Sequence, residues 1–462
     1  MNIERESGGR RSLPRRILNR FEIDQAVFFA MAARYWQFIA GPITLLLVMR
    51  FFSPETQGYY FTFWSVIGLQ NFFELAFPQT ILTTASHQWG QLELDESSGR
   101  VAGDPDSLSR LSHLFRVSMT VYAGIAFAFF VVLVIVGLNF FAVDDASDQL
   151  NWRLPWVGLV ALSSINFLLI PCLAALEGCD QVRAIYRMHL ARAVAGNLVV
   201  WGCLLAGMTL WIPAIAVAAR IVCELVLIFS RYYGFFASIS RKPIAAKLDW
   251  KGEIWPFQSK LIIKGFFNYF NSDLIIPVLF RYQDAVVAGQ FGMTWSVLQA
   301  IRGACSSWVR TRVPKMGSLI AKKDYRELDR IFARVGSIAL IAMTFLSLAL
   351  CVGIAILKVT EFRYAGRFLD VSPTALLCVG LLAGLAVEFQ WQYLHCHGKS
   401  PYVFITVSCC CLSGLLIWLL GSSIGVMGVC NAYLFMHALV YLPLSTTAWI
   451  KLRRQWHRES IE

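Results

Sequence analysis

The sequence predicts an all-α polytopic membrane protein, with about twelve transmembrane helices arranged as two six-helix lobes. The chain is 57% hydrophobic and 15% charged, whereas a soluble domain has about 25% charged residues. Its apolar residues form long continuous runs, not the alternating pattern of barrel strands. A short segment also recurs half a chain length later, which predicts an internal repeat.

Each long apolar run is interpreted as a helix, because about 20 apolar residues cross a bilayer. The predicted spans are 26–50, 57–85, 114–141, 155–176, 188–208, 211–233, 255–280, 285–308, 332–358, 372–395, 401–420 and 424–449. We expect a basic N-terminal arm at 1–25, a first lobe at 26–233, a basic linker at 234–254, a second lobe at 255–450 and a basic tail at 451–462.

The distribution of charge predicts the orientation of these spans. The net charge is +12, and Lys and Arg gather before the first span and after the sixth, eighth and last spans. The opposite loop 142–152 is acidic. Because positive charge stays inside, both termini of this multi-pass chain are expected in the cytoplasm. The acidic segment 87–113 then falls on the same side, but acidic residues weigh little in the rule. Nucleic-acid binding is not expected, since no soluble basic domain is present.

Two segments half a chain apart share a pattern. GYYFTFWSVI (58–67) and GQFGMTWSVL (289–298) are offset by 289 − 58 = 231 residues, and Trp64 matches Trp295. The copies begin the second and eighth predicted spans, so they have the same orientation. A parallel repeat of this kind is typical of transporters whose halves rock about a central cavity. A shared helix-packing pattern without kinship is the alternative.

Polar side chains recur on single faces of the predicted spans, and such groups usually face a partner or a water-filled cavity. The first span has Arg34, Gln37, Gly41 and Thr44 on one stripe, and the seventh has Lys260, Lys264, Asn268 and Asn271. The second has Asn71 and Glu74, and the eighth has Gln299, Arg302 and Ser306, with 71 + 231 = 302.

These stripes predict a cationic central cavity. The expected cavity cations are Arg34, Lys264, Arg302, Arg192 and Arg220, and the expected cavity polar residues are Gln37, Asn71, Asn268, Asn271 and Gln299. Arg220 and Glu224 lie at i and i+4 and could instead neutralise each other. The candidates for coupling or gating are Glu74, Asp273 and Glu388, although Asp273 and Glu388 could equally be satisfied interface residues. Arg and Lys bind phosphate, so a lipid-linked diphosphate is the expected substrate, although other large anions also fit.

Two segments resemble a known family. RFFSPETQGYYFTFWSVIGLQNFFELAFPQTI (50–81) and AGQFGMTWSVLQAIRGACSSWVRTRVPKMGSLIAKKDYRELDRIF (288–332) resemble Wzx-type polysaccharide flippases of the MOP superfamily. The resemblance implies a MATE-like V of two lobes in the bacterial inner membrane. It also implies that undecaprenyl-diphosphate-linked oligosaccharide moves from the inner to the outer leaflet for O-antigen, capsule or exopolysaccharide synthesis. By position, Arg34 and Lys264 would hold the diphosphate.

The resemblance has further implications for partners and for substrate. Membrane lipids, a polysaccharide polymerase and chain-length machinery are the implied partners. Lipid II flippases of the superfamily have two additional helices, so span counting disfavours that branch. Multidrug antiporters usually export cations, which a cationic cavity disfavours.

An enzyme is the main rival class, for example a polytopic polysaccharide polymerase or ligase. Such an enzyme would need a sizeable outward loop, and the outward loops 142–154 and 359–371 are short. Asp104-Pro105-Asp106 has the D-x-D form of some glycosyltransferases but is interpreted as a turn. No catalytic residue, cofactor or metal is expected. A G-x-x-x-x-G-K-S/T phosphate loop is missing, so ATP hydrolysis is not expected, and His395-Cys396-His397 lacks zinc-site spacing.

Overall fold

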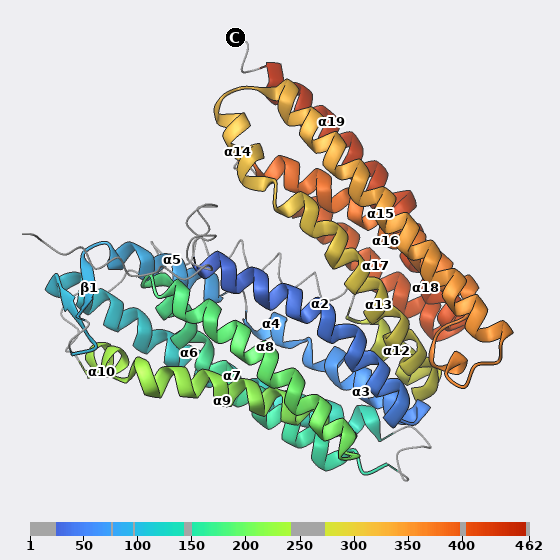
Figure 1. The fold of residues 1–462 in the computed structure, drawn as a ribbon, viewed down its shortest axis with the longest axis horizontal. Helices are drawn as coiled ribbons and strands as arrows, with labels where there is room; N and C mark the ends of the chain where they lie inside the picture. The colour runs from blue at the N-terminus through green and yellow to red at the C-terminus, as the bar shows by residue number, and fades with distance from the viewer. Residues whose placement is uncertain are drawn as a thin grey trace, which may run out of the picture.

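A computed structural model of the protein describes residues 25–74, 77–95, 98–142, 150–241, 273–397 and 403–458. These residues are nearly all helical, which confirms the predicted fold class. Figure 1 shows two helical bundles that meet at one end and diverge toward the other, in the shape of a V. We call these ends the joined end and the free end.

The first bundle begins at α2 and ends at α10 (Figure 1). Its helices are α2 (Gln25–Phe51), α3 (Pro54–Ile67), α4 (Gln70–Glu74), α5 (Phe77–Trp89), α6 (Pro105–Phe141), α7 (Arg153–Gly178), α8 (Val182–Leu205), α9 (Ile212–Arg231) and α10 (Tyr233–Arg241). The predicted linker therefore starts with a helix, since α10 packs against α6 and against the short strand β2 (Arg100–Gly103).

The second bundle contains the helices from α12 to α19 (Figure 1). They are α12 (Ile275–Tyr282), α13 (Ala285–Arg310), α14 (Val313–Ala321), α15 (Tyr325–Val359), η3 (Ala365–Arg367), α16 (Val371–His395), α17 (Val403–Ile424), α18 (Val426–Leu434), η4 (Phe435–Tyr441) and α19 (Leu442–Arg458). In the described part of this bundle, α14 and the end of α19 lie at the free end.

Within the described residues, nine helical segments are long and apolar enough to cross a membrane. They are α2, α6, α7, α8, α9, α15, α16, α17 and the segment 426–457. These match the predicted spans one, three to six and nine to twelve, so the protein is a multi-pass membrane protein. The eighth predicted span is the continuous helix α13, and most of the seventh lies outside the described residues.

The second predicted span is not a continuous helix, and the prediction of one run over 57–85 is wrong. Helix α3 ends at Ile67, and the Gly68 N–H bonds to both the Trp64 and the Ser65 carbonyls. The Asn71 N–H then bonds to the Gly68 carbonyl, three residues back. Such i to i−3 bonds tighten the chain into a 3₁₀ turn, a frequent mark of a hinge.

The twelfth predicted span extends past its expected end at 449. A π-helical segment over Phe435–Tyr441 joins α18 to α19, and α19 continues to Arg458. Pro443 follows this segment. Because proline lacks an N–H, it cannot give the i to i−4 bond of a regular helix.

A two-stranded antiparallel hairpin interrupts the all-helical pattern and was not predicted. Strand β1 (Leu92–Asp95) pairs with β2, with Leu92 opposite Gly103. Gly99 lies in the turn with a φ of +64°, which glycine adopts without strain. The alternation of Leu and acidic residues before Gly99 was the available signal.

The D-x-D segment Asp104-Pro105-Asp106, which the sequence analysis interpreted as a turn, forms the beginning of helix α6. Asp104 is the N-cap of α6, and its carboxylate accepts a hydrogen bond from the Ser107 N–H at 2.8 Å. That backbone bond lowers the pKa of Asp104 below its ordinary value. Pro105 occupies the first helical position, where its missing N–H does no harm.

The repeat offset recurs in the helix caps. Ser53 caps α3 by accepting from the Thr56 N–H at 3.1 Å, and Asp284 caps α13 by accepting from the Val287 N–H at 2.6 Å. Their separation is 284 − 53 = 231 residues. The two helices that carry the repeated segment therefore begin with the same kind of side-chain cap, at the offset of the predicted repeat.

We expect Ser53→Ala and Asp284→Ala each to lower the free energy of unfolding by about 1 kcal/mol, because each leaves a first-turn N–H without its side-chain acceptor. Denaturant unfolding of the purified protein in detergent measures the change. Ser53→Asp keeps an acceptor and serves as the control. Equal stabilities of Ser53→Ala and Ser53→Asp would contradict the capping role.

Candidate functional site

The two copies of the repeat pack against each other at the joined end. Helices α3 and α13 form the main contact between the bundles. A Cβ at Gly58 would lie 1.8 Å from the Ala285 carbonyl oxygen, and one at Gly289 would lie 2.8 Å from the Gly58 nitrogen. Real Cβ contacts are never this short. The two glycines therefore permit main chain to touch main chain, and the contact needs glycine on both sides.

Side-chain hydrogen bonds reinforce this junction, and each of them ends on a main-chain carbonyl. Gln57 Nε2 donates to the Gly289 carbonyl at 2.8 Å and to the Arg367 carbonyl at 3.3 Å. Arg367 donates in return to the Phe52 carbonyl, and Ser65 Oγ donates to the Asp273 carbonyl. The predicted gate residue Asp273 therefore lies at the junction, next to the turn at Gly68.

An ion-pair cluster lies inside the first bundle. Arg192 Nη1 and Arg220 Nε both donate to Glu224 Oε1, at 2.7 Å and 3.1 Å. The Glu224 side chain is 1% exposed. The predicted pairing of Arg220 with Glu224 is confirmed, and Arg192 joins it from α8. Glu74 lies within electrostatic range of Arg220 and accepts from Gln70 Nε2 at 2.7 Å.

The second bundle has a cluster of the same composition. Glu388 of α16 accepts from Arg302 Nη2 at 3.1 Å and from Arg310 Nη2 at 2.8 Å, and both donors are on α13. Each bundle therefore places one carboxylate between two guanidinium groups. Three of the predicted cavity cations have carboxylate partners, so the cationic surplus expected from them is smaller than the sequence suggests.

Arg34 differs from the other predicted cations of the described chain. Its side chain is exposed, and no carboxylate among the described residues lies within ion-pair distance of it. Helix α2 runs along the edge of the first bundle that faces the opening of the V (Figure 1). Tyr35 and Phe38 beside it are 70% and 62% exposed. A lone cation surrounded by exposed apolar side chains suits a ligand with a charged head and an apolar tail.

One face of α2 is fixed to α8, its main neighbour. Trp36 Nε1 donates to the Ala193 carbonyl at 3.1 Å, and Trp201 Nε1 donates to Thr44 Oγ1 at 2.9 Å. Thr44 therefore belongs to this helix contact, although the sequence stripe grouped it with Arg34. Gln37 is exposed, like Arg34.

The structure places only some of the remaining predicted site residues. Asn71 is exposed on the short helix α4, and Gln299 is half-buried on α13. Lys260, Lys264, Asn268 and Asn271 lie outside the described residues. Within the described part of the chain, no group of three His, Cys, Asp or Glu residues could hold a metal ion.

Sequence reasoning missed three residues that organise this region. Arg310 belongs to the basic residues that follow the eighth predicted span, yet it donates to Glu388. Arg367 lies in the loop 359–371, for which no role was predicted, yet it donates to the Phe52 carbonyl and so joins the two bundles. Gln57 directly precedes the repeat glycine Gly58. A polar residue beside a repeated glycine was the signal that could have identified it.

No family model and no curated protein matches the sequence, but solved structures match its fold. The lipid II flippase MurJ in an inward closed conformation is similar with a TM-score of 0.61 and 14% identity, over 93% of this chain and 90% of that one. An inward-facing multidrug resistance MATE transporter of the MOP superfamily gives a TM-score of 0.54 and 11% identity, over 89% of this chain and 99% of that one.

A third similar structure is the eukaryotic MATE transporter AtDTX14, with a TM-score of 0.52 and 12% identity over 96% of this chain and 99% of that one. Identities this low show a common fold and not a common substrate. These three structures are two MATE transporters and a lipid II flippase, and each match extends over both bundles. The chain therefore has the fold of MOP-superfamily transporters.

Proposed function

We propose that the protein is a flippase that moves undecaprenyl-diphosphate-linked oligosaccharide from the inner to the outer leaflet of a bacterial plasma membrane by alternating access. The observation that supports this most is Arg34, an exposed cation without a carboxylate partner among the described residues, next to exposed apolar side chains. The fold is also similar to that of a lipid II flippase.

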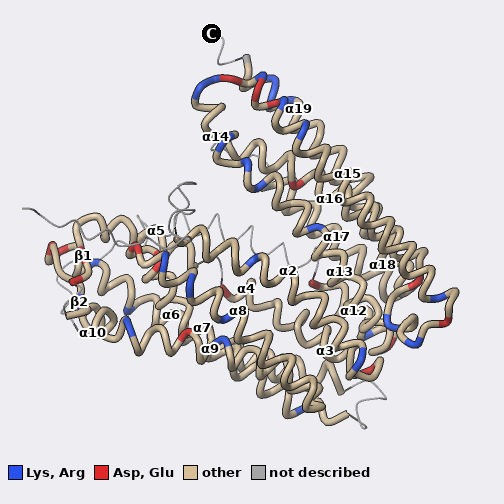
Figure 2. Tube along the Cα trace, in the orientation of Figure 1, with Lys and Arg blue, Asp and Glu red and all other residues tan. Residues whose placement is uncertain are grey.

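The orientation follows from charge. Figure 2 shows Lys and Arg gathered at the free end of the second bundle, around α14 and the end of α19. Loops rich in Lys and Arg lie on the cytoplasmic side of membrane proteins. The V would therefore open toward the cytoplasm, and the joined end would face outward. Substrate would then enter from the inner leaflet, and rocking about the α3–α13 contact would expose it to the outer leaflet.

Arg34 would hold one phosphate of the diphosphate through its fork of donors. Lys264, on the predicted partner span, would supply a second charge. The exposed rings of Tyr35 and Phe38 would contact the lipid chain. The paired arginines Arg192 and Arg302 would shape the lobes, since their guanidinium groups already bind carboxylates.

Complementation of a flippase-deficient bacterium tests the proposal. The native chain should restore surface glycan, and Arg34→Ala should reduce it at least about tenfold, because a charge-assisted hydrogen bond contributes about 1.5–3 kcal/mol. Lys264→Ala should reduce surface glycan to a similar extent, and Arg34→Lys should retain part of the activity. Arg50→Ala on the same helix is the control, since the Arg50 guanidinium lies 5.7 Å from the centre of the Phe51 ring and forms no ion pair with another described residue. Full activity of Arg34→Ala would refute the site.

Export of a drug-like molecule is the second candidate, supported by the similarity to MATE transporters. A cation such as Arg34 disfavours the cationic compounds that such transporters usually export. Efflux of a fluorescent cation by the native chain, unchanged in Arg34→Ala, would favour this alternative. An enzymatic role has less support, because Arg367 in the outward loop 359–371 is engaged in the junction.

A further inference from the structure

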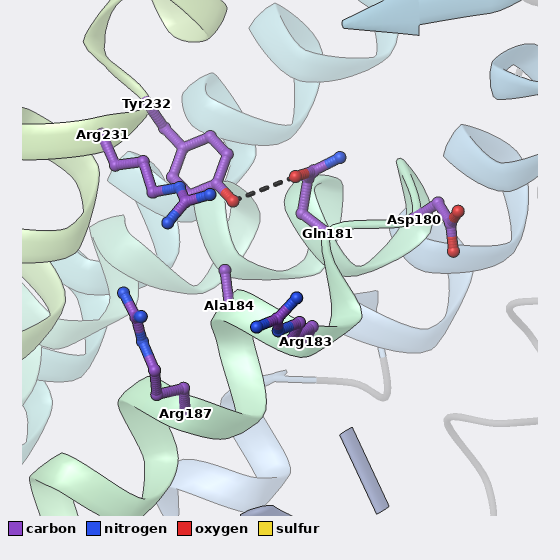
Figure 3. A pocket seen from close by; sticks show the side chains of 7 residues that line it. All are labelled: Asp180, Gln181, Arg183, Ala184, Arg187, Arg231 and Tyr232. Carbon is purple, nitrogen blue, oxygen red and sulfur yellow. Dashed lines mark hydrogen bonds between the residues drawn. The ribbon is translucent and has the colours of Figure 1, made fainter. Parts of the chain in front are cut away.

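A second basic site lies in the first bundle, away from the residues assigned to transport. A cavity of about 290 Å³ opens between the α7–α8 turn, the first turns of α8 and the end of α9. Arg183 and Arg187 of α8 and Arg231 of α9 line it, together with Gln181 and Tyr232 (Figure 3). Its volume is close to the lower limit for small-ligand sites.

The three arginines have no ion-pair partner among the described residues. Arg183 and Arg187 lie at i and i+4 on one helix face, an arrangement that destabilises a helix when the charges are alike. Arg231 adds a third positive charge from the end of the neighbouring helix. No carboxylate of a described residue lies within ion-pair distance of any of the three. Asp180 lines the far side of the cavity, and its carboxylate points away from the guanidinium groups (Figure 3).

The floor of the cavity is formed by a buried tyrosine and a half-buried glutamine. Tyr232 is 1% exposed, and its hydroxyl donates to Gln181 Oε1 at 3.0 Å. Gln181 is the N-cap residue of α8, but its side chain makes no capping bond to that helix. The bond to Tyr232 therefore joins the α7–α8 turn to the α9–α10 junction and fixes the distance between the arginine-bearing helices.

We propose that this cavity binds a phosphate group presented at the membrane surface. Arginine offers forked donors that match phosphate oxygens, and three of them would share one dianion or the diester of a lipid headgroup. The cavity lies at the ends of three candidate spans, which finish at Gly178 and Arg231 and begin at Val182. Headgroups lie at that depth. Arginine at inner span ends needs no ligand by itself, but here three such residues line one cavity.

Thermal unfolding of the full chain in nanodiscs tests the proposal. In phosphatidylcholine discs, added phosphatidylglycerol should raise the Tm of the native chain, and the gain should vanish in Arg183→Gln/Arg187→Gln/Arg231→Gln. Lys315→Gln/Lys322→Gln/Arg326→Gln removes three exposed cations elsewhere and should keep the gain. A rise in Tm with inorganic phosphate alone, lost in the same triple variant, would assign the site to free phosphate instead.

Two outcomes would overturn the proposal: no rise in Tm with either anion, or an equal rise in the native chain and the triple variant. If the triple variant folds poorly, the single variant Arg187→Gln replaces it. This variant should lower the affinity for the anion about tenfold, because it removes one charge-assisted hydrogen bond. Arg34→Ala should keep the full effect. The test of this site is therefore independent of the test of the flippase proposal.

Discussion

Gly58→Ala is expected to force the two bundles apart at the joined end. The added Cβ would lie 1.8 Å from the Ala285 carbonyl oxygen, and main chain cannot swing away as a side chain can. Overpacking of this kind typically costs about 1–3 kcal/mol, which shifts a two-state equilibrium by roughly fivefold to 150-fold. States with a separated joined end should become populated. In the proposed orientation the outer side would then no longer close, so transport should be lost.

Pulsed electron–electron resonance between spin labels at Glu55 and Phe362 measures this separation, in a chain whose native cysteines are replaced. Gly58→Ala should move the distance distribution to longer values. Gly303→Ala is the matched control, since it lies on α13 and its Cβ would meet no atom within 4 Å. Identical distributions for the native chain and Gly58→Ala would show that the junction does not depend on this contact.

Glu224→Ala is expected to destabilise the first bundle by roughly 3 kcal/mol, because removing one partner of a buried ion pair leaves the other charges uncompensated. The carboxylate is buried, but Arg192 and Arg220 are 25% and 40% exposed. That partial exposure places the effect at the lower end of the usual range. Denaturant unfolding in detergent gives the change in the free energy of unfolding.

Glu327→Ala is the comparison, since it removes an exposed pair with Arg330, whose side chain is 77% exposed. A loss below about 1 kcal/mol is expected there. Similar losses for Glu224→Ala and Glu327→Ala would mean that the buried cluster adds no particular stability. If Glu224→Ala kept full stability but lost transport, the cluster would be assigned a role in the substrate path and not in the stability of the bundle.

The fold was predictable because its dominant signal is local. Apolar runs of sufficient length indicate spanning helices, and nine such segments match the described structure. The break at Gly68 escaped prediction because a glycine inside an apolar run is compatible with both a helix and a turn. The turn depends on which carbonyls the Gly68 N–H reaches, and that is set by packing.

The candidate site was less predictable, because charge on a helix face does not reveal its partner. Arg302 and Glu388 are 86 residues apart in sequence, and Arg192 and Glu224 are 32 apart. Only the i, i+4 pair of Arg220 and Glu224 could be inferred from spacing. The repeat was visible in the sequence, but it did not reveal that the copies touch each other.

The hydrogen bonds of the junction share a property that bears on how the protein can vary over evolution. Gln57, Ser65 and Arg367 donate to main-chain carbonyls of Gly289, Asp273 and Phe52. Every residue type offers such a carbonyl, so Asp273 and Phe52 can change side chain without losing the bond, whereas Gly289 is also required by its close contact with Gly58. Selection on closure should therefore act on the three donors and the contact glycines, while the sequence around the accepting carbonyls drifts.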